Sequence, residues 1–229
     1  GDVAGAVQYL LSRPDIDPRR IGLIGQSQGT WIIAKGAARD SGIAFLVNIS
    51  GSGISAAEQE TYRTGALMQA DSFSAADIAR ARAFQQQKFR VARTGVGWEA
   101  LDSTMKRLRA DSVKWFPGYG TGAAARSLAV LRLYGVLQFN YDPTRDLQRI
   151  RVPVYVIMGE NDRVFPPATV IERMRAALHA GGNDQLTSII IPNAGHALTT
   201  LQTFHGKPFR RAISPAFLQT LVGWLTAGR

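Results

Sequence analysis

The run IGLIGQSQGT at residues 21–30 constrains this 229-residue chain more than any other segment. Its apolar first half is typical of a short buried strand, and a helical pattern follows at once, so the chain must turn sharply between them. The turn carries the pattern G-x-S-x-G, which holds Ser27 on a strained bend with its Oγ above the end of the sheet. Bulky side chains two positions to either side would collide with the adjoining strand and helix, which predicts that Gly25 and Gly29 are needed. Ser27 is therefore a candidate nucleophile.

A serine hydroxyl is a poor nucleophile at neutral pH, so it needs a base, and the base needs an acid to orient it. Asp162 follows the apolar run 152–158, and His196 follows the apolar run 186–192. A carboxylate just past the carboxyl end of a buried strand is well placed to reach a histidine over the sheet edge. The sequence thus predicts a catalytic set of Ser27, Asp162 and His196.

Each of these candidates has a competing interpretation. The nucleophile could be an ordinary helix cap, because serine favours helix starts. Glu160 lies two residues before the acid candidate and is the alternative carboxylate. The chain has two other histidines, His179 near the end of a predicted helix and His205 in a predicted polar loop at residues 204–207.

Three blocks of the sequence resemble those of the serine α/β-hydrolases, particularly bacterial esterases and prolyl-oligopeptidase-like hydrolases. The blocks are DPRRIGLIGQSQG at 17–29, GENDRV at 159–164 and NAGH at 193–196. The order Ser27, Asp162, His196 is the chain order of that family. The resemblance implies an α/β-hydrolase fold, with a mostly parallel sheet flanked by helices, and it favours Asp162 over Glu160.

The resemblance also implies an activity. The triad would cleave carboxylic esters of small or medium size through an acyl-enzyme intermediate, with the backbone N–H of Gln28 as an oxyanion donor. Peptidases and thioesterases use the same triad on the same fold, so these alternatives stay open. An aminopeptidase would need an acid to bind the substrate amine, for which Glu58, Glu60 and Asp71 are candidates. A non-catalytic hydrolase-like binding protein is the alternative from another class.

The periodicity predicts a core interrupted by an insertion. We expect a first part of the hydrolase core at residues 1–55, a helical cap at 56–140 and a second part of the core at 141–229. The elements predicted for the core are a strand that begins at residue 21 and ends at the turn 25–29, strands in the runs 43–49, 152–158 and 186–192, and helices at 2–12, 29–38, 169–180 and 215–227. The family fold normally has several strands before the nucleophile strand. We therefore expect those strands, and a loop with the second oxyanion donor, to lie upstream in a longer protein.

Composition and charge limit the classes of partner that this chain is expected to bind. The formal net charge is +10, but the basic residues are spread along the chain and no nucleic-acid motif appears, so we expect no nucleic-acid partner. No apolar run is long enough for a membrane span. The absence of cysteine excludes disulfides and thiolate catalysis and leaves the compartment open. No metal or dinucleotide motif appears, so we expect no metal or cofactor, only a small-molecule ester substrate. The sequence leaves the oligomeric state open.

Overall fold

A computed structural model describes residues 1–39, 42–119, 126–134 and 140–227. The chain divides into two compact units. The sheet unit consists of Gly1–Ile54 and Pro143–Arg229, and the helical unit consists of Ser55–Asp142. Each unit is described by itself below.

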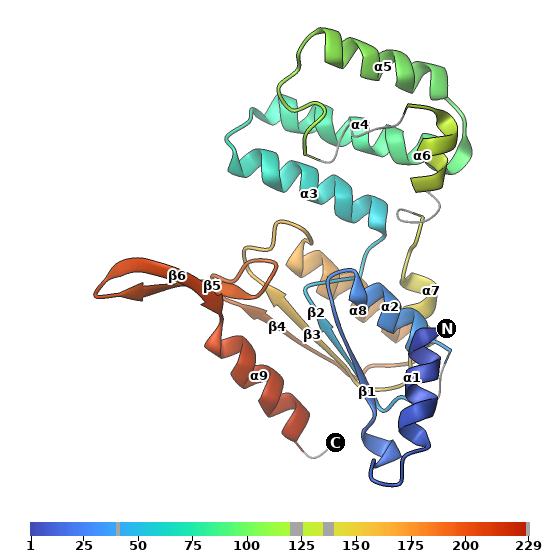
Figure 1. The fold of residues 1–229 in the computed structure, drawn as a ribbon, viewed down its shortest axis with the longest axis vertical. Coiled ribbons are helices and arrows are strands. Elements are labelled where there is room, and N and C mark those ends of the chain that lie inside the picture. The colour runs from blue at the N-terminus through green and yellow to red at the C-terminus, as the bar shows by residue number, and fades with distance from the viewer. Residues whose placement is uncertain (40–41, 120–125, 135–139, 228–229) are drawn as a thin grey trace. The chain divides into compact units, whose positions relative to one another are not determined.

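The sheet unit contains a four-stranded parallel sheet (Figure 1). Its strands are β1 (Gly22–Gln26), β2 (Phe45–Ile49), β3 (Val154–Gly159) and β4 (Leu186–Ile191), in the order β1-β2-β3-β4. The central strand β3 is buried along its whole length, as expected of a continuous apolar run in a sheet covered on both faces. Because all four strands are parallel, their carboxyl ends lie at one edge of the sheet. The four strands predicted from the sequence are confirmed.

Helices cover the two faces of this sheet. They are α1 (Asp2–Leu11), α2 (Gly29–Ala37), α7 (Thr144–Leu147), α8 (Pro167–Ala180) and α9 (Pro215–Thr226), with a short 3-10 helix at Pro18–Arg20. Val154, Val156 and Met158 of β3 pack with residues of α1, α2, α7 and α8. The alternate residues Tyr155 and Ile157 pack on the other face with Trp224 of α9. The period of two along β3 therefore builds two cores in this unit.

An antiparallel hairpin follows the parallel sheet. It pairs β5 (Thr199–Phe204) with β6 (Lys207–Ile213). The sequence analysis placed His205 in a polar loop at residues 204–207, and the structure has a turn there, but the two strands on either side of it were not predicted. His205 and Gly206 form the turn with φ values of +49° and +74°. Both strands are largely exposed, so they lack the clean apolar alternation by which a half-buried strand is recognised.

The helical unit has a core of its own. It contains α3 (Ala56–Ala70), α4 (Ala75–Thr94), α5 (Trp98–Ala110) and α6 (Leu128–Tyr134). Ser55 and Glu58 form a reciprocal capping box at the start of α3, and α4 ends at Gly95 with φ +75°. Buried apolar side chains from the helices and the segment after α5, including Leu101 and Trp115, form one cluster. Within the described ranges, no helix is both long and apolar enough to cross a membrane.

Candidate active site

Ser27 lies at the bend between β1 and α2. Its φ is +52°, a left-handed backbone that residues other than glycine rarely adopt. The N–H of Ser27 donates to the carbonyl of Ile49 at 2.9 Å, which ties the bend to the end of β2. Its carbonyl accepts from the N–H of Thr30 at 3.1 Å and from the Thr30 hydroxyl at 2.5 Å. The bend is thus held on both sides by hydrogen bonds to neighbouring elements.

The two glycines of the G-x-S-x-G pattern differ in what they contact. A Cβ on Gly25 would come within 2.7 Å of the carbonyl oxygen of Gly29 and 2.9 Å of the nitrogen of Thr30. The steric need expected for glycine is therefore found at Gly25. At Gly29 no such need is found, because a Cβ there would meet no described atom within 4 Å beyond its chain neighbours and the nearby backbone of its own helix. The backbone of residue 29 is therefore what lies close to Gly25 at this bend, whereas the position of a side chain on residue 29 is open.

Asp162 lies in the turn after β3, at the same edge of the sheet. Its side chain is fully buried. One carboxylate oxygen, Oδ1, accepts the N–H groups of Val164 at 2.7 Å and Phe165 at 3.0 Å. The other oxygen, Oδ2, is 3.0 Å from Nδ1 of His196. Two backbone donors therefore fix the orientation of the carboxylate and leave Oδ2 for the histidine.

His196 lies in the loop after β4, and its Nε2 is 3.0 Å from Oγ of Ser27. The ring packs nearly parallel to that of Phe165, with centroids 5.9 Å apart at 21°. The loop rests directly on the end of β3. The N–H of Asn161 donates to the carbonyl of Ala194 at 2.8 Å, and a Cβ on Gly159 would collide with the loop backbone. The side chain is 27% exposed, so solvent reaches a ring that the loop holds in place.

The carboxylate and the two histidines that were alternative candidates for the acid and the base make other contacts in the structure. Glu160 accepts the N–H of Asn193 through Oε2 at 2.8 Å, so it supports the turn of the histidine loop and not the ring. His179 bonds to Asp184 at 2.6 Å on the surface. His205 occupies the turn of the exposed hairpin against Phe204. Neither of these histidines contacts Ser27 or Asp162.

Gln28 precedes the first residue of α2, and its side chain is exposed. No described residue accepts a hydrogen bond from its backbone N–H. A free N–H beside Ser27 at a helix N-terminus has the position and polarity to bind a developing oxyanion.

Sequence reasoning missed several residues that support this arrangement. Thr30 accepts the N–H of Ser52 at 3.0 Å while its hydroxyl donates to Ser27, so it joins α2 to the segment after β2. Phe165 contributes both an N–H to Asp162 and a ring beside His196. No motif of the sequence marks either role, because each also includes a contact to a distant segment, that of Ser52 for Thr30 and that of His196 for Phe165.

The arrangement is a hydrogen-bonded chain from carboxylate to imidazole to hydroxyl. With Nδ1–H donating to Asp162, the imidazole of His196 presents a lone pair on Nε2 to the hydroxyl of Ser27. Such a chain can move a proton from the hydroxyl to the ring while the buried carboxylate stabilises the imidazolium that forms.

Known proteins share this fold. The structure resembles an esterase from Pyrococcus furiosus at 16% identity with a TM-score of 0.51, where the match covers 99% of this chain and 60% of the esterase. It resembles a 2,6-dihydroxy-pseudo-oxynicotine hydrolase at 16% identity with a TM-score of 0.50, over 100% of this chain and 46% of that hydrolase. Acetyl xylan esterase 1 from Thermoanaerobacterium sp. matches at 17% identity with a TM-score of 0.41, over 98% of this chain and 50% of the esterase. The chain thus spans half or slightly more of the length of the esterases it matches. A search of curated proteins finds no match.

The sequence pattern of the alpha/beta hydrolase family matches residues 1–206, most of the chain. The predicted α/β-hydrolase fold is confirmed, since the parallel sheet flanked by helices is present and its structural neighbours are hydrolases. By this match along its sequence, the chain belongs to the alpha/beta hydrolase family.

Proposed function

We propose that this protein is a serine hydrolase that cleaves carboxylic esters of small or medium size. The observation that carries the proposal is the unbroken pair of 3.0 Å contacts that links Asp162 to His196 and His196 to Ser27. Family membership supports a hydrolytic reaction. The esterases among the structural neighbours share the fold alone at their level of identity, so the ester itself belongs to the proposal.

The proposed reaction runs in two halves. Ser27 Oγ attacks the acyl carbonyl as its proton passes to Nε2 of His196, and the resulting oxyanion accepts the N–H of Gln28. His196 then protonates the leaving alcohol as the ester C–O bond breaks, which leaves an acyl-enzyme. Water gives its proton to His196 and attacks the acyl carbon, and Ser27 recovers the proton as the acid departs. Asp162 holds the ring in the required tautomer throughout.

The local partners of three carboxylates favour the ester over an aminopeptidase substrate. Glu58 accepts the N–H and the hydroxyl of Ser55 in the capping box, at 3.0 and 2.7 Å. Glu60 pairs with Arg63 at 3.4 Å, and Asp71 accepts the hydroxyl of Tyr119 at 2.7 Å. Each acid considered for binding a substrate amine thus already has a partner within the helical unit.

The helical unit is proposed to act as the cap that selects substrates. Its position in the sequence supports this role, because it is inserted between β2, whose end adjoins Ser27, and β3, whose end carries Asp162. Exchange of residues 56–140 for the insertion of another family member should shift the preferred acyl length and leave Ser27 reactive. An unchanged preference would contradict the role.

The test is hydrolysis of p-nitrophenyl esters from acetate to decanoate by the longest available form of the protein. Ser27→Ala and His196→Ala should each abolish turnover. His205→Ala is the matched control, because this histidine lies in the same unit away from Ser27, and it should keep full activity. Turnover that persists in Ser27→Ala would show that the nucleophile is another group.

Two further substrates and a probe separate the alternatives. Faster cleavage of aminoacyl anilides or of acyl thioesters than of the esters would replace the esterase proposal with a peptidase or a thioesterase. A fluorophosphonate labels only an activated serine, so labelling of the wild type but not of Ser27→Ala is expected. Absence of both turnover and labelling would favour a non-catalytic binding protein.

A further inference from the structure

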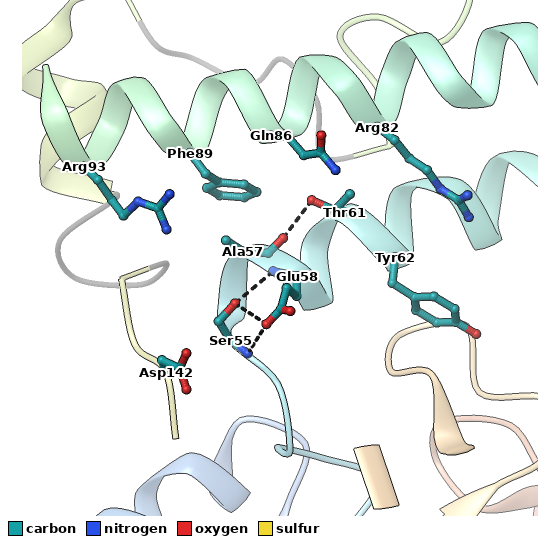
Figure 2. A pocket seen from close by; sticks show the side chains of 10 residues that line it. All are labelled: Ser55, Ala57, Glu58, Thr61, Tyr62, Arg82, Gln86, Phe89, Arg93 and Asp142. Atoms are coloured by element: carbon teal, nitrogen blue, oxygen red, sulfur yellow. Dashed lines mark hydrogen bonds between the residues drawn. The ribbon is translucent and has the colours of Figure 1, made fainter. Parts of the chain in front are cut away.

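A cavity of about 630 Å³ lies within the helical unit, along the α3 and α4 helices (Figure 2). Four of its lining residues are Arg82, Gln86, Phe89 and Arg93, whose spacing places them on one face of α4. The opposite wall is formed by the first two turns of α3, and Asp142 closes one end. The cavity therefore combines cationic, polar and aromatic side chains on rigid helices.

Arg82 is held in this wall by an unusual contact. Its guanidinium group lies where a side chain at Gly65 of α3 would be, so that a Cβ on Gly65 would collide with Nε, Cζ and Nη2. Nε is buried and has no hydrogen-bond partner among the described residues. Glycine at position 65 thus makes a slot for the guanidinium of a residue that also lines the cavity.

Among the described residues, the positive charge of Arg82 has no counter-ion within salt-bridge distance. Neither Arg82 nor Arg93 forms an ion pair within the described part of the chain, whereas Arg63 and Arg80 on the same two helices pair with Glu60 and Asp77. A guanidinium that has lost part of its hydration without a paired anion is costly, and a bound anion removes that cost.

The remaining lining residues limit the charge and shape of that anion. Glu58 and Asp142 also line the cavity, so a singly charged group is favoured over a doubly charged phosphate. Phe89 is 4% exposed and Tyr62 is half-buried, so the cavity has aromatic side chains in its wall as well as the cation. Arginine presents its donors in a planar fork that matches a carboxylate.

We propose that this cavity binds a small organic carboxylate, with the carboxylate on the Nη groups of Arg82 and the apolar body against Phe89 and Tyr62. This proposal does not depend on ester hydrolysis at Ser27. Arg93 lies on the same face of α4 and adds attraction for the anion without being buried.

The experiment is calorimetric titration of the full 229-residue chain with phenylacetate and with its neutral isostere phenylacetamide. Phenylacetate should bind about tenfold or more tightly than the amide, since a hydrogen bond to a charged group is lost in the amide. Arg82→Gln should weaken phenylacetate binding by about the same factor. Arg80→Gln is the matched control, because Arg80 lies on the same helix, is exposed and does not line the cavity, and it should bind as the wild type does.

Three results would overturn the proposal: no saturable binding of phenylacetate, equal affinity for the amide, or an unchanged affinity in folded Arg82→Gln. If that variant fails to fold, the proposal is still tested by comparing the affinities of the two ligands for the unsubstituted chain. The titration is repeated with Ser27→Ala, which should retain binding. Loss of binding there would place the ligand at the proposed catalytic serine and would also overturn the proposal.

Discussion

At Gly25, the space for a single methyl group decides whether the bend that carries Ser27 can form. The backbone of α2 passes so close to this residue that a Cβ would contact both Gly29 and Thr30 below 3 Å. The same methyl group on Gly29 would enter open space. Close backbone contact therefore excludes a Cβ at Gly25 but not at Gly29.

This asymmetry predicts opposite effects of the same substitution. Gly25→Ala should lower the free energy of unfolding by about 1–3 kcal/mol, because packed backbone must move. Gly29→Ala should leave the free energy of unfolding unchanged or raise it by up to about 1 kcal/mol, since alanine favours a helical position over glycine. Urea denaturation of both variants measures the difference. A loss in Gly29→Ala as large as that in Gly25→Ala would contradict the steric argument.

The two neighbouring carboxylates after β3 also have separable roles. Asp162→Asn should reduce kcat by roughly 10³–10⁴-fold, because the amide favours the wrong imidazole tautomer. Glu160→Gln keeps an oxygen acceptor for the N–H of Asn193, so its kcat should change by less than about threefold, as expected of an exposed contact. Steady-state kinetics on a p-nitrophenyl ester compare them. A larger loss in Glu160→Gln than in Asp162→Asn would reverse the assignment of the acid.

At the scale of the element, the first turn of α2 is joined to the segment after β2 by one side chain. Thr30 is fully buried, donates to the carbonyl of Ser27 and accepts from the N–H of Ser52. A Cβ on Gly51 would collide with this side chain, so the two segments are in close contact there. The orientation of Ser27 thus depends on a contact between a helix and the segment after a strand, not on the sequence of the bend alone.

A pair of substitutions isolates the hydroxyl of Thr30. Valine has the shape of threonine but leaves the buried N–H of Ser52 without an acceptor, so Thr30→Val should lower the free energy of unfolding by about 1–3 kcal/mol and reduce kcat. Thr30→Ser keeps the hydroxyl and should retain kcat, at a smaller cost from one lost methyl group. Denaturation and ester kinetics on both variants test this. If Thr30→Ser is the more damaging of the two, the role belongs to the methyl group.

At the scale of the whole molecule, the sheet unit and the helical unit have separate cores. The cluster around Leu101 and Met105 shares no residue with either cluster of the sheet unit. Because side-chain packing acts over contact distances, a cavity in one core removes contacts only there. The stability of the insertion is therefore expected to be separable from that of the sheet.

Leu101→Ala and Leu178→Ala test this separation, since both leucines are fully buried, one in each unit. Each should cost about 2–5 kcal/mol locally. Hydrogen exchange should accelerate in α3–α5 for Leu101→Ala and in β2, β3 and α8 for Leu178→Ala. Equal acceleration of β3 exchange in both variants would show that the two units unfold as one.

The positions of Ser27, Asp162 and His196 at one edge of a parallel sheet could be predicted from the sequence alone. The reason is topological: each follows a strand pattern, and parallel strands place their carboxyl ends together. The periodicities of two and 3.6 that mark strands and helices are local, so the core elements of the sheet unit were predictable too. The hairpin at β5 and β6 was not, because its exposed strands carry no such signal.

The resemblance already favoured Asp162 over Glu160, but only the tertiary structure decided which contact each carboxylate makes. Oδ2 of Asp162 faces the ring of His196, whereas Glu160 accepts the N–H of Asn193. The tertiary structure also decided the roles of Thr30 and Phe165, and the slot that Gly65 makes for Arg82. These contacts join residues that are distant in the chain or lie on different elements. Local sequence determines where an element begins and which of its faces is apolar. Side-chain partners depend on the packing of whole elements, which no local pattern records.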